Sequence, residues 1–116
     1  MNTEKNISQM RKGVLELCIL SVIGKRDEVY ASDILHELKQ AQLIVVEGTL
    51  YPLLTRLKND KLLSYRWEES KSGPPRKYYQ LTAKGHELLH SLKSGWNELV
   101  AAVEQLIETP EKTKNL

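Results

Sequence analysis

The segment from residue 47 to residue 82 constrains the fold most, because a helix pattern runs directly into a basic β-hairpin pattern. Four leucines follow the spacing i, i+3, i+4 and i+7 of one buried helix face over residues 48–60: Leu50, Leu53, Leu54 and Leu57. Two β-type runs come next, residues 62–69 and 77–82, with a predicted loop over residues 70–75. A helix followed by a basic hairpin is typical of a winged helix-turn-helix.

Positive charge is concentrated in this same part of the chain. Residues 49–82 carry seven Lys or Arg against three Asp or Glu, a balance of +4, whereas residues 83–116 carry four against five, a balance of −1. The formal net charge of all 116 residues is only +2. A basic segment in a nearly neutral chain favours a polyanionic partner at one face. On charge alone, an ordinary solvated surface is the alternative.

Two further helices are predicted before this segment. The first covers residues 7–24 and is apolar on two sides, so it needs two packing partners. One of its faces carries apolar residues at helical spacing: Ile7, Met10, Val14 and Leu17. The second helix covers residues 31–41. Residues 43–46, Leu-Ile-Val-Val, form a short β-prone run that would add a strand to the hairpin.

The last predicted helix, residues 83–108, carries a heptad seam of apolar residues: Leu89, Leu92, Trp96, Leu99, Val103 and Leu106. At about 1.5 Å per residue this helix spans roughly 39 Å, which is too long for one small domain to cover the seam. We therefore expect a homodimer built by this helix, with help from Met10, Val14 and Leu17. The predicted organisation is a DNA-binding domain over residues 1–82, a dimerisation helix over 83–108 and a polar tail over 109–116.

Two motifs carry a family resemblance. Residues 48–57 spell GTLYPLLTRL, and residues 76–82 spell RKYYQLT. With these segments at this separation, the chain resembles the PadR family of transcriptional regulators. The resemblance implies a mainly α winged helix-turn-helix with a small β-hairpin wing and a long C-terminal dimerisation helix. It also implies a repressor, relieved by a small-molecule effector, that binds double-stranded DNA at a two-fold operator as a homodimer.

Nine residues are the predicted DNA-binding set: Tyr30, Thr49, Tyr51, Pro52, Arg56, Asn59, Lys71, Arg76 and Lys77. Those on the 48–60 helix are placed to reach base edges or phosphates, and those on the wing to reach the DNA backbone or minor groove. Tyr30 is included because the resemblance places a tyrosine near the DNA there. The chain departs from the usual family pattern at Ser32, which replaces a second tyrosine, at Pro74, which replaces a wing cation, and at Lys61, which replaces a glycine.

Trp96 has a second interpretation besides packing in the seam. Some multidrug-sensing members that the chain resembles carry a tryptophan at this place, facing its symmetry mate across an apolar pore. A pair of indoles can hold a planar aromatic or cationic small molecule by stacking and cation–π attraction. Trp96 is therefore the predicted ligand-binding residue, with simple core packing as the alternative.

Residues 86–90, His-Glu-Leu-Leu-His, match the HExxH pattern of zinc metalloproteases. A catalytic zinc needs a third protein ligand and an open position for water, yet Glu98, Glu104 and Glu108 would point away along the same helix. We therefore expect no enzyme, no catalytic or metal-binding residues and no cofactor. A winged-helix adaptor that binds protein instead of DNA is the closer alternative, and a metal-binding enzyme ranks third.

The chain shows no features of a secreted or membrane protein. Its single cysteine, Cys18, cannot form an intrachain disulfide. The N-terminal residues lack the apolar core of a signal peptide, and no apolar run approaches the roughly 18–20 residues of a membrane span. We expect a cytoplasmic protein without a membrane partner.

Overall fold

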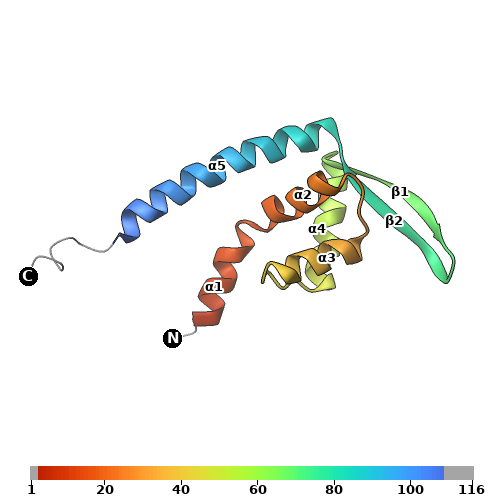
Figure 1. The fold of residues 1–116 in the computed structure, drawn as a ribbon, viewed down its shortest axis with the longest axis horizontal. Helices are drawn as coiled ribbons and strands as arrows, with labels where there is room; N and C mark the ends of the chain where they lie inside the picture. Colours follow the sequence, from red (N-terminus) through yellow and green to blue (C-terminus); the bar gives the residue numbers. More distant parts are fainter. Residues whose placement is uncertain (1–2, 109–116) are drawn as a thin grey trace, which may run out of the picture.

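The computed structural model describes residues 3–108 (Figure 1). Its elements are α1 Thr3–Lys12, α2 Leu15–Arg26, α3 Ala31–Gln40, α4 Glu47–Asn59, β1 Leu63–Ser70, β2 Gly73–Leu81 and α5 Ala83–Ile107. Helices α2, α3 and α4 form the body, the β1–β2 hairpin projects from it as a wing, and α5 runs away from the wing. The predicted fold class, a mainly α winged helix-turn-helix with a long C-terminal helix, is confirmed. The predicted polar tail over 109–116 lies outside the described residues.

The hydrophobic core lies where α2, α3 and α4 meet the base of the wing. Its largest fully buried side chains come from these helices and from Val29, which lies between α2 and α3. They are Ile19, Leu20, Ile23, Val29, Ile34, Leu50, Leu54 and Leu57. Full burial of such an aliphatic side chain contributes about 1.5–3 kcal/mol. Three of the four predicted leucines of α4 are in this set, and Leu53 is partly buried against it. The leucine stripe therefore decides which side of α4 faces outward.

The segment predicted as one helix over residues 7–24 is two helices in the structure. α1 ends at Lys12, α2 begins at Leu15, and Val14 between them has φ −111° and ψ 0°. Gly13 is the physical reason, because glycine is one of the poorest helix formers and makes a break inexpensive. The apolar face expected to run straight through the segment is interrupted here. Met10 on α1 is 74% exposed.

The wing turns more tightly than the predicted six-residue loop. Ser70 pairs with Gly73, which leaves only Lys71 and Ser72 in the turn. The pairing register shifts between Glu68 and Ser70, so a bulge precedes the turn. Pro74 and Pro75 therefore belong to β2, where proline is tolerated near the start of a strand.

Residues 43–46 do not add a strand as predicted, because they are occupied in joining α3 to α4. The sheet formed by the described residues has two strands. The strand-like pairing beside β2 comes instead from Val29. The Val29 N–H donates to the Tyr79 carbonyl at 3.1 Å, and the Tyr79 N–H donates to the Val29 carbonyl at 2.8 Å. This pair of bonds joins the wing to the turn that precedes α3.

The start of α5 is locked onto the end of α4. Thr82 is the N-cap of α5: its hydroxyl accepts from the Gly85 N–H at 3.0 Å and donates to the Lys61 carbonyl at 2.7 Å. Gly85 lies so close that a Cβ atom there would stand 2.1 Å from the Leu62 carbonyl oxygen. Only a residue without a side chain fits this contact, so Gly85 sets the direction in which α5 leaves the body.

Lys61 is expected to lower the free energy of unfolding relative to glycine at this position, because its φ of 63° is in the left-handed region. That region costs a residue with a side chain roughly 1–2 kcal/mol, whereas glycine enters it freely. Lys61→Gly should therefore raise the free energy of unfolding by about 1 kcal/mol. Urea denaturation at fixed protein concentration measures this. Lys58→Gly, within α4, is the matched control and should lower stability by about 1 kcal/mol. Equal losses for both variants would contradict the backbone explanation.

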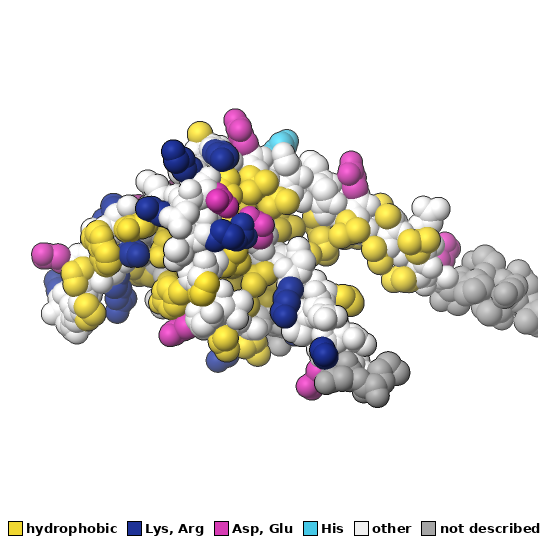
Figure 2. All heavy atoms as spheres, turned by 180° about the vertical axis from the view of Figure 1, so that it is seen from behind, with side chains coloured by type: hydrophobic (Ala, Val, Ile, Leu, Met, Phe, Trp, Pro, Cys, Tyr) yellow, Lys and Arg dark blue, Asp and Glu magenta, His cyan; other side chains and the backbone are white. Residues whose placement is uncertain are grey.

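Over its second half, helix α5 has an apolar side that the other residues within 3–108 leave exposed. Leu89 is buried and Leu92 partly buried, but Trp96, Leu99, Val103 and Leu106 are 43%, 53%, 42% and 83% exposed. Figure 2 shows this apolar surface along the helix that leads to the grey tail. With Met10 of α1 and Val14 just before α2, it borders a hollow of about 400 Å³ lined almost only by apolar atoms. Among the described residues, no helix is long and apolar enough to cross a bilayer.

Candidate nucleic-acid interface

A groove of about 410 Å³ lies between the wing, the start of α3 and the exposed side of α4. Aromatic and basic side chains from these elements share its lining: Tyr30, Tyr51, Trp67, Arg76 and Lys77. Four of these, all but Trp67, belong to the predicted DNA-binding set. The fold thus brings residues from three separate segments to one surface that can accept a polyanion.

The exposed side of α4 has two edges. Successive residues turn by about 100° around a helix, which places Tyr51 and Thr55 toward the wing and Thr49 and Arg56 toward α1 and α2. The contacts agree with this placement. Tyr51 and Thr55 line the groove, whereas Thr49 lines a separate hollow of about 200 Å³ beside α1. The predicted set is therefore spread across the whole outer surface of α4.

Arg56 is engaged by two carboxylates within the chain. Its guanidinium lies 3.6 Å from Glu16 on α2 and 3.5 Å from Asp60 at the end of α4. The Arg56 side chain nevertheless remains 52% exposed. Exposed ion pairs contribute little to stability because solvent screens them. These ion pairs therefore leave the guanidinium available to another anion at small cost.

The two wing cations lie against different aromatic rings. The Lys77 ammonium lies 4.5 Å from the Tyr65 ring centroid and 5.2 Å from that of Trp67. Arg76 lies 5.1 Å from the Tyr30 ring. Alternate residues of a strand face opposite sides, so Arg76 and Lys77 contact different aromatic rings although they are neighbours in β2. Aromatic contacts of this kind hold cations in place while leaving their charge available.

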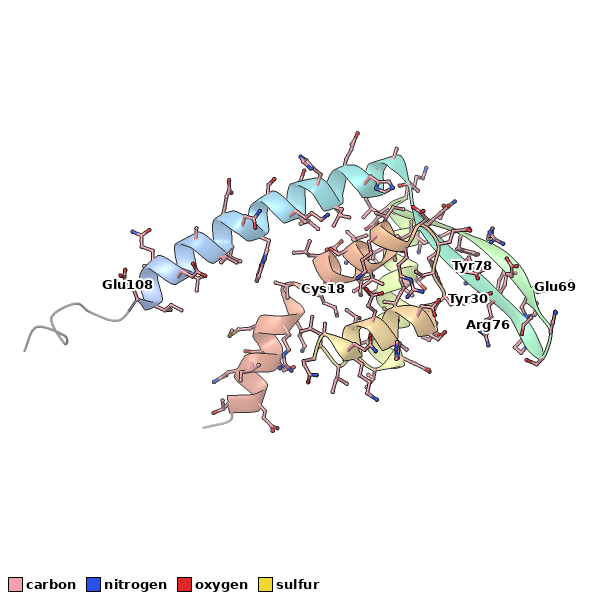
Figure 3. All side chains as sticks on the ribbon, viewed as in Figure 1. Cys18, Tyr30, Glu69, Arg76, Tyr78 and Glu108 are labelled. Carbon is pink, nitrogen blue, oxygen red and sulfur yellow. The ribbon has the colours of Figure 1, made fainter. Side chains whose placement is uncertain are left out.

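Tyr30 and Tyr78 form the aromatic contact between the body and the wing (Figure 3). Their ring centroids are 3.9 Å apart and their planes differ by 22°. A hydrogen bond with the Tyr78 hydroxyl, together with desolvation, raises the pKa of Tyr30 to about 12. A tyrosine phenol is neutral near pH 7 even at its ordinary pKa, so Tyr30 adds no negative charge to the basic groove.

The other predicted residues are exposed but lie outside the groove lining. Pro52 and Asn59 occupy the outer surface of α4, and Lys71 lies in the wing turn. The prediction missed Trp67, which is 61% exposed and lines the groove, and Lys58, whose ammonium lies 5.7 Å from the Tyr65 ring. Strand alternation would have found Trp67, because it pairs directly with Lys77.

The HExxH residues do not form a metal centre in the part of the chain that the structure describes. His86 and His90 are exposed on α5. No group of three or more His, Cys, Asp or Glu residues within 3–108 is arranged to hold a metal ion. His86 and Asp27 line a small hollow that shares no lining residue with the groove.

Comparison with known proteins identifies the family. The model of the transcriptional regulator PadR-like family matches residues 19–91. The chain belongs to the PadR-like family. A solved PadR-like transcription factor from Bacteroides fragilis is 60% identical to it, with a TM-score of 0.73 over 88% of this chain and 98% of the other. A PadR-like transcriptional regulator from Bacillus cereus is 40% identical, with a TM-score of 0.77 over 88% and 99% of the two chains.

A third PadR structure was solved in complex with DNA. It is Bacillus subtilis PadR in complex with operator DNA, 26% identical, with a TM-score of 0.62 over 68% of this chain and 46% of that one. This PadR-like chain is therefore a transcriptional regulator and not an enzyme. In its His-Glu-Leu-Leu-His segment, His86, Glu87 and His90 are exposed on α5, whereas Leu89 is buried in the core.

Proposed function

We propose that this PadR-like regulator is a cytoplasmic homodimer that binds double-stranded DNA at a two-fold operator and represses transcription until an effector binds. The observation that carries the proposal is the groove in which α4, the start of α3 and the wing meet. It combines Arg76 and Lys77 with exposed aromatic rings. Operator DNA bound to a PadR structure of similar fold supports this use of the surface.

The geometry suits a recognition helix. α4 has 13 residues and buries its leucine stripe, so its opposite side is free to enter the major groove. The wing lies beside α4 and carries cations that would neutralise phosphates. In a two-fold dimer, two such helices would meet successive major grooves about 34 Å apart.

The dimer part of the proposal rests on the apolar side of α5. Four residues of the predicted seam are more than 40% exposed in a single chain: Trp96, Leu99, Val103 and Leu106. A contiguous apolar side that a single chain leaves exposed is typical of an interaction surface. A second copy is the occupant that a seam of heptad spacing favours, because two such helices pack knobs into holes. The proposed domain division keeps residues 1–82 for DNA and 83–108 for this pairing.

Substitutions on the two edges of the interface test the DNA-binding proposal. Arg56→Ala should weaken binding to the DNA upstream of the protein's own gene by about 1–3 kcal/mol if Arg56 pairs bidentately with guanine. Lys77→Ala should weaken binding to all duplexes about equally and reduce the dependence of affinity on salt. Gel shifts at two or more salt concentrations measure both effects. If neither substitution changes the affinity, the assigned DNA surface is wrong, and the protein-interaction adaptor becomes the better account.

Trp96 is proposed as the effector-binding residue. Its indole is 43% exposed and borders the apolar hollow between α1 and α5. In Trp96→Leu, the affinity for a planar cationic dye should fall by about two- to thirtyfold, the worth of one cation–π contact. Fluorescence titration in the absence of DNA measures this, with Trp67 as the remaining emitter. Unchanged dye affinity in a Trp96→Leu dimer would leave Trp96 as a packing residue only.

A further inference from the structure

Four side chains form a continuous stack between the wing and the body. The Arg66 guanidinium lies 4.7 Å from the Tyr78 ring, the Tyr78 and Tyr30 rings are 3.9 Å apart, and the Arg76 guanidinium lies 5.1 Å from Tyr30. The order is cation, ring, ring, cation. We call this set the Arg66–Arg76 stack. Three of its members are on the wing, and Tyr30 precedes the first turn of α3.

The Arg66 end of the stack is anchored to the body by a carboxylate. Arg66 Nε donates to Glu28 at 2.8 Å, and a second Arg66 nitrogen donates to the other Glu28 oxygen at 3.2 Å. Bidentate pairing of this kind fixes the plane of a guanidinium. Arg66 also pairs with Glu68 on its own strand. Glu28 is next to Val29, whose two backbone bonds to Tyr79 join the wing to the body.

The Arg76 end of the stack reaches the groove. Arg76 and Tyr30 both line it, whereas Arg66, Tyr78 and Glu28 do not. Figure 3 shows Arg76 and Tyr30 beside each other, between α3 and the wing, with Tyr78 next to them. Arg66 and Tyr78, which lie outside the groove lining, are therefore linked to Arg76 through the stack, and Glu28 is linked to the stack through Arg66.

We propose that Glu28, Arg66 and Tyr78 are positioning residues for DNA binding. They fix the angle of the wing against α3 and hold the Arg76 guanidinium at the groove, without contacting DNA themselves. The inference rests on the proposed function and adds residues to it. The inference implies that the Glu28 carboxylate increases the affinity for DNA, although its negative charge alone would repel a polyanion.

The sign of the effect of Glu28→Gln separates positioning from simple electrostatics. Loss of a negative charge strengthens or preserves binding to DNA if only the local charge matters. If Glu28 holds Arg66 and the stack in place, the same substitution weakens binding by about three- to tenfold. Glu69→Gln is the matched control. Glu69 is exposed on the wing and its side chain makes no hydrogen bond or ion pair with residues 3–108, so its substitution should leave the affinity unchanged or increase it.

Substitution of Tyr78 tests the ring contacts. Tyr78→Phe keeps the stacked ring and loses only the hydroxyl bonded to Tyr30, so it should bind DNA within about twofold of the wild type. Tyr78→Leu removes the ring and should bind about three- to tenfold more weakly. Amide hydrogen exchange of Val29 and Tyr79 in the DNA-free protein gives a second readout. Exchange at these two positions should accelerate in Glu28→Gln and Tyr78→Leu but not in Glu69→Gln or Tyr78→Phe.

The binding assay uses the full chain and a duplex of the DNA upstream of its own gene at one salt concentration. Weaker binding and faster exchange in Glu28→Gln, with both controls close to wild type, would support the proposal. Glu28→Gln binding as tightly as the wild type, or more tightly, would overturn the positioning role while leaving the proposed function intact. A wild-type protein that fails to bind any duplex would overturn the proposed function and this inference together. The Glu28 side chain is 36% exposed and is not part of the hydrophobic core, so its substitution is not expected to prevent folding.

Discussion

Leu99→Asp should convert the protein from a dimer into a monomer and reduce its operator affinity to the non-specific level. Leu99 is 53% exposed in the single chain, so a carboxylate there costs an isolated chain little. Buried between two α5 helices without a partner, the same carboxylate carries a desolvation penalty of several kcal/mol. Val103→Asp, at a position that is 42% exposed, should behave in the same way.

Sedimentation equilibrium at micromolar concentration measures the effect. Ala101→Asp is the control, because Ala101 is exposed and lies on the opposite side of α5 from Leu99 and Val103. It introduces the same charge into the same helix and should leave the dimer intact. A wild-type protein that sediments as a stable, folded monomer would refute the dimer. Equal dissociation by Ala101→Asp would show that helix charge, and not the apolar seam, controls assembly.

Gly85→Ala should lower the free energy of unfolding by about 3 kcal/mol, near the upper end of the usual cost of overpacking. A Cβ atom at this position would stand 2.1 Å from the Leu62 carbonyl oxygen, and backbone cannot rotate away as a flexible side chain can. The start of α5 would have to move. The Thr82 cap, which accepts from the Gly85 N–H, would be strained at the same time.

Urea denaturation at fixed protein concentration measures the loss, because the stability of a dimer depends on concentration. Gly48→Ala makes the same substitution in the first turn of α4, where a Cβ atom would meet nothing within 4 Å. It should leave stability unchanged or raise it by less than about 1 kcal/mol, since alanine favours helix. Similar losses in both variants would contradict the steric explanation.

The helices were the most predictable part of the structure. The leucine stripe of α4 and the heptad seam of α5 gave boundaries within one residue of those observed, since apolar spacing and burial have the same cause. The break after α1 was not predicted, because apolar spacing continues through Gly13 and only its poor helix propensity opposes a helix there. The wing turn was misplaced because consecutive prolines suggested a loop, whereas β2 accommodates Pro74 and Pro75.

The groove was only partly predictable. Residue type and position identified Tyr51, Arg76 and Lys77 as groove residues. Tyr51 lies on the outer surface of α4, which the leucine stripe predicts, and Arg76 and Lys77 lie on the wing, which the β-type runs predict. The pairing of Arg56 with Glu16 depends on how α2 packs against α4, and no local pattern encodes it. The Arg66–Arg76 stack likewise joins residues from distant segments through tertiary packing.

The most direct test of the central claim is the affinity of the wild-type protein for the DNA upstream of its own gene, compared with a scrambled duplex of equal length. A recognition helix and a basic wing predict a preference of about a thousandfold or more for the specific site. Both affinities should fall between about 50 mM and 200 mM salt as phosphate contacts are screened. Equal affinity for the two duplexes, or no binding at the lower salt concentration, would contradict the assignment of the α4–wing groove as an operator-binding surface.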